Sequence, residues 1–198
     1  MNTTLQTPTP LRVVVVSGSV QHPSRTDALL RGITHALAQH LALDSQFIAL
    51  AQIGADVGGV LRRAGATPTV EAALRSIETA DVLLVGSPVY RASYTGLLKH
   101  LFDLVHHEAL FDVPVLLAAT GGSERHALML DHPLRPLFAF FQAHALPVGL
   151  YASETDFTGH TLSSPAVQAR IQLAVSRALP LLQPRGARLA DAPFAASA

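Results

Sequence analysis

The chain has 198 residues, of which 49% are hydrophobic and 14% charged, and 14 basic side chains balance 14 acidic ones. The absence of cysteine excludes a disulfide framework, a thiolate metal site and a cysteine nucleophile. A neutral balance without a basic stripe argues against nucleic acid as a partner, and no apolar run approaches the roughly 20 residues of a membrane span. No signal peptide is recognisable, so we expect a cytoplasmic protein with a large core, and its apolar excess predicts a homo-oligomer.

Short apolar runs alternate with longer segments of helical periodicity. The runs predict strands at residues 11–17, 46–50, 81–87, 113–120 and 146–152. The periodic segments predict helices at residues 27–43, 69–79, 94–105, 124–145 and 165–182. The glycine-rich stretch 53–68 is expected to be a loop. One domain at 11–183 is then preceded by a flexible segment at 1–10 and followed by a loose tail at 184–198.

This alternation predicts an α/β fold, in which a doubly wound, five-stranded parallel sheet carries helices on both faces. In such a sheet the ligand binds at the carboxyl ends of the strands, where the strand order reverses. The loops that follow Val16, Val85 and Ala119 are therefore expected to form the site.

The first of these loops has the composition of a phosphate pocket. It reads Ser17-Gly18-Ser19-Val20-Gln21-His22-Pro23-Ser24-Arg25-Thr26 and leads into a helix. Free backbone N–H groups and the positive end of the helix dipole would face an anion there. The loop lacks the Gly-x-Gly-x-x-Gly pattern of dinucleotide folds and the lysine of the P-loop, so it suits one monophosphate, as in a mononucleotide flavin. The alternative is an ordinary turn with a Ser or Thr N-cap.

The next two loops have features of a site for a flat ligand. Pro88 holds its chain extended, so that backbone amides and the Tyr90 ring could lie against the ligand. Ser93 or Thr95 is expected to cap the following helix. In the third loop, Gly121-Gly122 permits positive φ and close approach of main-chain donors. Each loop alone also fits an ordinary turn, but three at consecutive strand ends predict one site.

Together, Gly18-Ser19, Ser24-Arg25-Thr26 and the segments 87–99 and 119–123 resemble the NAD(P)H-dependent FMN reductase family. The likeness is closest to the reductases that serve alkanesulfonate and methanesulfonate monooxygenases, and it spans about residues 11–182. It implies a flavodoxin-like fold, assembly as dimers or tetramers, and FMN as a substrate. Reduced FMN would then pass to a partner flavin-dependent monooxygenase.

The resemblance also assigns roles to residues. The FMN phosphate would be held by Ser19, Ser24, Thr26 and Arg25, the ring and ribityl chain would be lined by Pro88, Val89, Tyr90 and Arg91, and the pyrimidine edge would be approached by Gly121, Gly122 and Ser123. Hydride transfer from NADH or NADPH to FMN requires stacked rings and no side-chain acid or base. We therefore expect no catalytic side chain and no metal.

Other functions use the same loops. An azo-, quinone- or chromate-reducing enzyme would keep its FMN bound, and a flavodoxin-type electron carrier would bind FMN without turning over nicotinamide. Such carriers are usually strongly acidic, which this chain is not. The choice between NADH and NADPH is open, with Arg25, Arg91 and Arg125 as candidates for contact with a 2′-phosphate.

The pattern of residues 124–145 is interrupted by Asp131-His132-Pro133-Leu134-Arg135-Pro136. Both prolines remove a helical N–H group. Either one helix ends near Leu130 and another begins at Pro133, or the helix carries a kink or a π-bulge, which often marks a functional place. In the sulfonate-linked reductases this helix lies at the subunit interface, and an inserted residue there is associated with flavin release. By that resemblance, His132 or His126 would be the residue associated with flavin release in this chain.

Overall fold

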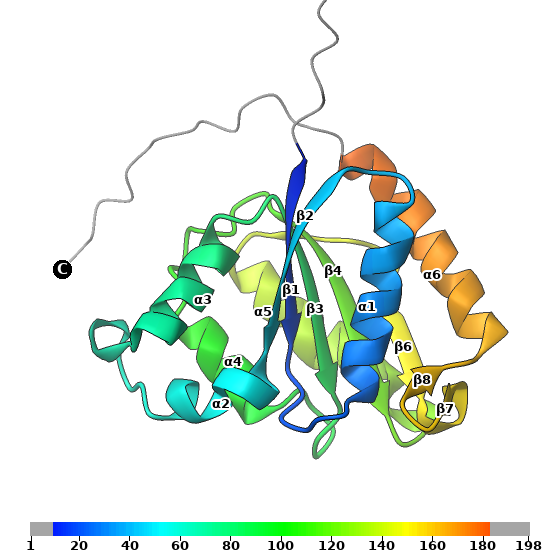
Figure 1. The fold of residues 1–198 in the computed structure, drawn as a ribbon, viewed down its shortest axis with the longest axis horizontal. Coiled ribbons are helices and arrows are strands. Elements are labelled where there is room, and N and C mark those ends of the chain that lie inside the picture. Colours follow the sequence, from blue (N-terminus) through cyan, green and yellow to red (C-terminus); the bar gives the residue numbers. More distant parts are fainter. Residues whose placement is uncertain (1–9, 183–198) are drawn as a thin grey trace, which may run out of the picture.

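The computed structural model describes residues 10–182, so the predicted tail and all but the last residue of the predicted N-terminal segment lie outside the described residues. A parallel sheet forms the middle layer (Figure 1). Its strands are β1 (Leu11–Ser17), β2 (Leu43–Ala49), β3 (Val82–Pro88), β4 (Pro114–Gly121), β5 (His144–Ala145) and β6 (Leu150–Ser153). They lie in the order β2-β1-β3-β4-β5, with β6 also paired to β4. This is the flavodoxin-like order, as predicted.

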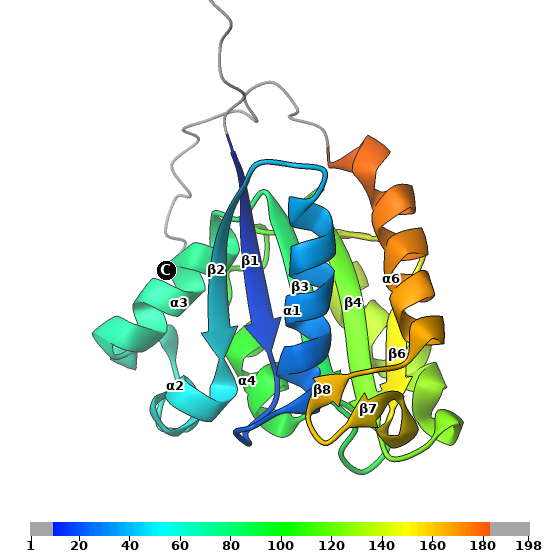
Figure 2. The ribbon, with the colours of Figure 1, turned by 45° about the vertical axis from the view of Figure 1, so that its right-hand side comes forward.

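Helices cover both faces of the sheet (Figures 1 and 2). Their bounds are α1 (Arg25–Ala38), α2 (Leu50–Gly58), α3 (Pro68–Glu78), α4 (Gly96–Asp103), α5 (Arg135–Phe140) and α6 (Pro165–Ala178). Val13 and Val15 of β1 pack in the core under α1 and α6, whereas Val14 and Val16 pack in the core under α2 to α5. The continuous valine run is thus explained by burial of the strand on both faces. Within residues 10–182, no helix combines the length and the apolar character needed to cross a bilayer.

The predicted loop at 53–68 is wrong over its first residues, because α2 is a helix. Leu50, Gly54 and Val57 form its buried face. A Cβ atom added to Gly54 would lie 3.3 Å from Cδ1 of Leu97 in α4. Glycine at position 54 allows α2 and α4 to approach closely. The glycines that suggested a loop therefore belong to a contact between two helices.

Two other boundaries differ from the prediction. The strand β2 begins at Leu43, where it pairs with Leu11, so the apolar spacing that suggested a helix to residue 43 belongs partly to the sheet. Helix α3 begins at Pro68, one residue before the predicted start, because Thr67 is its N-cap and accepts the Val70 N–H at 3.3 Å. Proline suits the first helical position, where its missing N–H costs nothing.

The predicted strand at 146–152 is confirmed only from residue 150 on, in β6, and the short β5 lies before the predicted range. Val115 of β4 pairs with Ala145, but Ala118 pairs with Leu150, so the edge strand gains two residues between these pairs. Pro147 lies in the interruption and has no N–H to donate to a ladder.

The predicted helix at 124–145 contains a π-segment, which was one of the two alternatives for its interruption. A 3₁₀ turn (Glu124–Met129) is followed by a π-helix (Leu130–Leu134) and by α5. The Arg135 N–H bonds to the Leu130 carbonyl, five residues back, and Pro133 lies inside the wider turn. His126 and His132 are exposed.

The same helical stretch ends earlier than predicted, at Phe140. Gln142 adopts a φ of 52°, and the N–H groups of Gln142 and Ala143 bond to the carbonyls of Ala139 and Phe138. This is a Schellman ending formed without glycine, so the sequence carries no signal for it.

Candidate functional site

A groove of about 200 Å³ opens where β1, β3 and β4 end. Eight of its lining residues were predicted from the sequence: Ser19, Ser24, Arg25, Pro88, Val89, Tyr90, Gly121 and Gly122. The other lining residues are Gln21, Pro23, Thr120 and His160. The structure therefore brings the three predicted loops together, whereas Thr26, Arg91 and Ser123 do not line the groove.

The first wall of the groove is the beginning of α1. Ser24 is its N-cap, and the Ser24 hydroxyl accepts the Asp27 N–H at 3.2 Å. Helix geometry leaves the N–H groups of Arg25 and Thr26 without an intrahelical acceptor. The helix dipole adds partial positive charge at the same point. This wall offers hydroxyl and amide donors to an anion.

Arg25 is already engaged with another part of the chain. Its guanidinium forms an ion pair with Glu154 at 2.8 Å, and its Nε donates to the Gly159 carbonyl at 3.1 Å. Gly159 lies in the turn between β7 (Phe157–Thr158) and β8 (Thr161–Leu162). Figure 2 shows this hairpin beside the start of α1. Arg25 thus joins the hairpin to the first wall.

The Thr26 side chain lies beneath the groove. It is buried, and its hydroxyl is 2.7 Å from the hydroxyl of Thr120 at the end of β4. This contact fixes α1 against the third loop. The resemblance placed Thr26 at the FMN phosphate, but in the structure its side chain connects two walls and does not line the groove.

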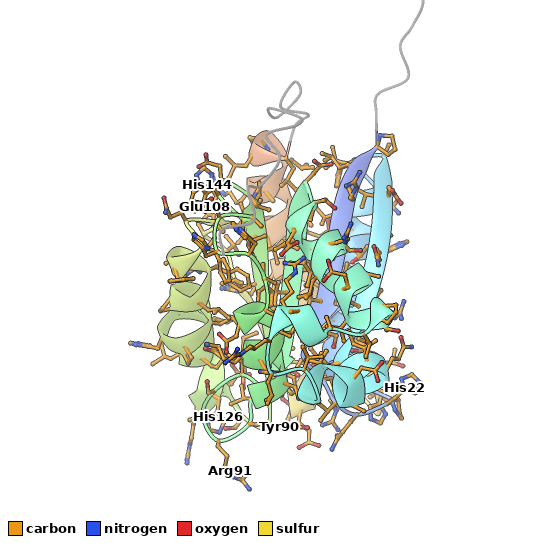
Figure 3. The ribbon with its side chains drawn as sticks, turned by 90° about the vertical axis from the view of Figure 1, so that its left-hand side faces the viewer. His22, Tyr90, Arg91, Glu108, His126 and His144 are labelled. Carbon is orange, nitrogen blue, oxygen red and sulfur yellow. The ribbon has the colours of Figure 1, made fainter. Side chains whose placement is uncertain are left out.

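The second wall is a tight turn that continues β3. The N–H groups of Tyr90 and Ser93 each bond to the carbonyl of the other, at 2.8 and 3.1 Å. The two residues between them, Arg91 and Ala92, have φ values of 51° and 67°. Such a turn normally carries glycine or asparagine. Arg91 projects outward at the end of the molecule that carries Tyr90 and His126, far from Glu108 and His144 (Figure 3).

We expect Ala92→Gly to stabilise the protein by roughly 0.5–1 kcal/mol, because glycine adopts positive φ without the Cβ penalty. Thermal unfolding should show a rise of a few degrees in Tm. Ala139→Gly, on the exposed side of α5, is the matched control and should lower Tm, since its helix requires no such backbone freedom. A lower Tm for Ala92→Gly would contradict the assignment of strain to this turn.

Hydrogen bonds beneath the groove hold the first two loops together. The Gly18 N–H donates to the Gly86 carbonyl at 2.7 Å, and the Thr95 hydroxyl donates to the Gly18 carbonyl at 2.8 Å. Thr95 is also the N-cap of α4, as one of the two predicted alternatives, and its N–H donates to Ser87 Oγ at 3.1 Å. The loops therefore have a fixed spacing.

The third wall depends on a close approach between Gly121 and Tyr151. A Cβ atom on Gly121 would overlap the Tyr151 hydroxyl and lie 3.1 Å from its Cζ. That hydroxyl donates to the Ser123 carbonyl at 2.6 Å. Burial, and then the carboxylates of Glu124 and Asp156, raise the pKa of Tyr151, which keeps the phenol protonated as a donor.

Gly121 and Gly122 do not use the positive φ that glycine permits, since Gly159 is the glycine with positive φ within residues 10–182. Gly121 is required by the packing of Tyr151 below it. Gly122 is different, because a Cβ atom there would meet nothing within 4 Å. Its bare backbone faces open space in the groove.

Comparisons with known proteins identify the family of this chain. The family described as NADPH-dependent FMN reductase matches residues 11–158. The chain belongs to this family. A Pseudomonas aeruginosa protein named FMN reductase (NADPH) is 56% identical over 172 residues, which cover 87% of this chain and 92% of that protein. A Pseudomonas putida protein named NADH-dependent FMN reductase SfnF is 58% identical over 163 residues, which cover 82% and 88%.

The fold of the reductase is also found among solved structures. The X-ray structure of an oxidoreductase from Corynebacterium diphtheriae matches with a TM-score of 0.77 and 31% identity, covering 87% of this chain and 97% of that one. The family resemblance inferred from the sequence is thus confirmed, together with the fold that it implied.

Sequence reasoning about the reductase missed the hairpin side of the groove. Gln21 and Pro23 belong to the predicted first loop, and Thr120 ends the predicted fourth strand. His160, by contrast, lies far along the chain from every predicted loop. The signal available was a Thr-Gly-His-Thr turn at 158–161, which predicts a hairpin but not where the hairpin packs.

Hydrogen bonds within residues 153–156 fix the segment that leads into this hairpin. Ser153 and Asp156 form a capping box, in which the Asp156 carboxylate accepts the Ser153 N–H at 2.7 Å and the Ser153 hydroxyl at 2.9 Å. Burial by itself would raise the pKa of Asp156, but these bonds and one from Ser164 outweigh burial and lower the pKa. The ionised carboxylate thus fixes the chain just before β7.

Proposed function

We propose that the groove holds FMN as an exchangeable substrate, which the enzyme reduces with NADH or NADPH and supplies to a flavin-dependent monooxygenase. The observation that carries this proposal is the convergence of three loops at the ends of β1, β3 and β4 on one groove. A relative named NADH-dependent FMN reductase SfnF supports the reductase assignment. The monooxygenase partner rests on the sequence resemblance to reductases of sulfonate monooxygenase systems. The supply of reduced nicotinamide makes the cytoplasm the expected location.

The residues present fit a mononucleotide flavin. Ser19 and Ser24 offer hydroxyls beside the free amides at the start of α1, which suits one phosphate. Pro88, Val89 and Tyr90 offer an extended wall for a flat ring, and Gly122 leaves its backbone open to a polar ring edge. When bound, FMN supplies the hydride-accepting ring, and the protein supplies orientation.

The groove encloses only part of a flavin nucleotide. Pockets that enclose most of a drug-sized ligand have volumes of roughly 300–1,000 Å³, and this groove has about 200 Å³. We infer that the nicotinamide reaches FMN from the open side of the groove.

The coenzyme preference rests on different residues. The two named relatives differ, one carrying NADPH in its name and the other NADH. Arg25 is paired with Glu154, whereas Arg91 and Arg125 are exposed. We infer that one of these two exposed arginines faces the 2′-phosphate when NADPH binds.

Steady-state kinetics test the proposal. Initial rates are measured with FMN varied at fixed NADH and again at fixed NADPH, using protein purified without added flavin. FMN should saturate as a substrate and the purified protein should be colourless. A yellow protein that turns over without added FMN would contradict release and favour an FMN-retaining reductase. The absence of any NAD(P)H oxidation with added FMN would instead favour an electron carrier.

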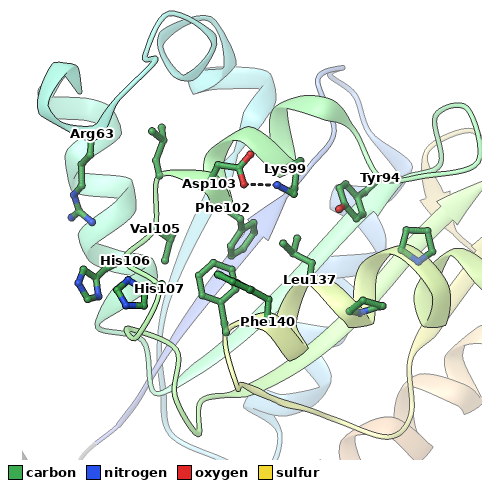
Figure 4. Close-up of a pocket in the computed structure, with 14 residues that line it drawn as sticks. Arg63, Tyr94, Lys99, Phe102, Asp103, Val105, His106, His107, Leu137 and Phe140 are labelled. Carbon is green, nitrogen blue, oxygen red and sulfur yellow. Dashed lines mark hydrogen bonds and ion pairs between the residues drawn. The ribbon is translucent and has the colours of Figure 1, made fainter. Parts of the chain in front are cut away.

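We also propose a homo-oligomer, dimer or tetramer, formed through the face of α4 and α5. A second groove of about 800 Å³ lies there, lined by Tyr94, Phe102, Leu137, Phe140 and Phe141 among others (Figure 4). Phe140 is 67% exposed, and exposed apolar surface of this kind marks protein contacts. Pro133 and Pro136 line the same groove, so the π-segment borders the proposed interface.

Phe140→Asp is expected to lower the oligomeric mass measured by sedimentation equilibrium, because it places a charge in the proposed contact. Leu61→Asp is the matched control, since Leu61 is 88% exposed outside this groove and should leave the mass unchanged. A monomeric wild-type protein, or an unchanged mass for Phe140→Asp, would contradict this interface.

A further inference from the structure

His160 enters the groove from a part of the chain that the three strand-end loops do not include. It occupies the turn between β7 and β8, where Gly159 has a φ of 63°. The side chain lines the same groove as Ser19, Ser24 and Arg25. An exposed turn histidine ordinarily faces solvent, but His160 lies beside the proposed phosphate end of the groove.

The hairpin is fastened to the first wall. Arg25 at the start of α1 reaches the Gly159 carbonyl, the neighbour of His160, and also pairs with Glu154 before the hairpin. On the other side, the Asp156 carbonyl accepts the N–H groups of Ser163 and Ser164 at 3.0 and 3.1 Å. The turn is thus held at both ends, and the position of His160 relative to α1 is fixed.

The contacts of Arg25 and His160 favour binding of an anion beside the His160 ring. The guanidinium of Arg25 is occupied by Glu154 and Gly159, so it faces an anion in the groove with its charge partly neutralised. The His160 ring makes no hydrogen bond or ion pair within the described part of the chain. An imidazole N–H is a donor to phosphate in either tautomer, and both nitrogens donate in the charged form.

We propose that His160 is an additional ligand of the FMN phosphate, supplied by the β7–β8 hairpin. This inference rests on the proposed FMN groove and deepens it, because it adds a fourth chain segment to the groove and a second one to its phosphate end. The side chain acts on affinity and on the discrimination between FMN and riboflavin, which lacks the phosphate. It takes no part in hydride transfer.

The test compares dissociation constants for FMN and riboflavin, measured by quenching of flavin fluorescence. His160→Ala should raise the dissociation constant for FMN about tenfold, the effect expected when a hydrogen bond to a charged group is lost. The dissociation constant for riboflavin should stay unchanged. His160→Gln, which retains an N–H donor, should recover part of the loss. Thr161→Ala, the adjacent hairpin residue outside the groove, is the matched control and should alter neither ligand.

Two outcomes would overturn the role of His160. One is an unchanged FMN constant in His160→Ala. The other is an equal loss for FMN and riboflavin, which would indicate a ring contact or a displaced hairpin. If the first outcome comes with a change in the NADPH-to-NADH ratio of kcat/KM, the residue belongs to the coenzyme site instead. A Ser24→Asp variant that leaves FMN binding intact would contradict the groove itself, so the two failures are distinguishable.

Discussion

Ser24→Asp should weaken FMN binding at least a hundredfold and leave the fold intact. Aspartate is as good an N-cap as serine, so the Asp27 N–H keeps its acceptor and α1 keeps its first turn. The new carboxylate would lie where we propose the FMN phosphate. Two unit charges about 4 Å apart repel by about 4 kcal/mol near a protein surface, which exceeds the free energy of a hundredfold change.

The controls for this variant separate charge from structure. Riboflavin carries no phosphate, and its dissociation constant should change little in Ser24→Asp. Ser24→Ala removes the cap without adding charge, so it should lower the free energy of unfolding by about 1 kcal/mol. It should weaken FMN binding less than Ser24→Asp does. Equal weakening of FMN and riboflavin in Ser24→Asp would show that the phosphate lies elsewhere.

Gly121→Ala is expected to disrupt the third wall. Its methyl group would overlap the Tyr151 hydroxyl, so either the loop or the tyrosine ring must move and the bond to the Ser123 carbonyl is lost. An overpacked site of this kind costs roughly 1–3 kcal/mol. Thermal unfolding should therefore show a clear fall in Tm, and kcat/KM for FMN should fall at least tenfold because the wall is displaced.

Two further variants make this prediction specific. Gly122→Ala adds the same methyl group one residue later, in open space, so its Tm should be unchanged while FMN binding weakens if the ring edge lies there. Tyr151→Phe removes the overlapping hydroxyl, and Gly121→Ala combined with Tyr151→Phe should lose less stability than the sum of the single variants. Strict additivity would mean that the two residues do not compete for space.

Much of the site could be predicted because its signals are local. Ser24 precedes a helical pattern, and Pro88 and the glycine pair follow buried strands, so residue type and strand order suffice to place them on one edge of a sheet. Gly121 shows the limit of this reasoning. Its paired glycine suggested a special backbone angle, but the actual constraint is the ring of Tyr151, a residue thirty positions away.

The remaining differences have the same origin. Gly54 and Gly58 are typical of a loop, but Leu97 packs against both and α2 is a helix. Thr26 was expected to bind the phosphate, yet its hydroxyl forms a hydrogen bond with the Thr120 hydroxyl. The sequence around His160 does not indicate a binding site.

The sequence by itself determined the α/β order, the three loops and the family, because periodicity and short motifs act within a few residues of one another. It left open whether the two prolines separate two helices or lie in a π-segment. Only the tertiary structure decided which predicted side chains face the groove, which arginine is already paired, and that the β7–β8 hairpin belongs to the site. These depend on contacts between segments distant in sequence, where packing and hydrogen bonding select one arrangement among many that the local pattern allows.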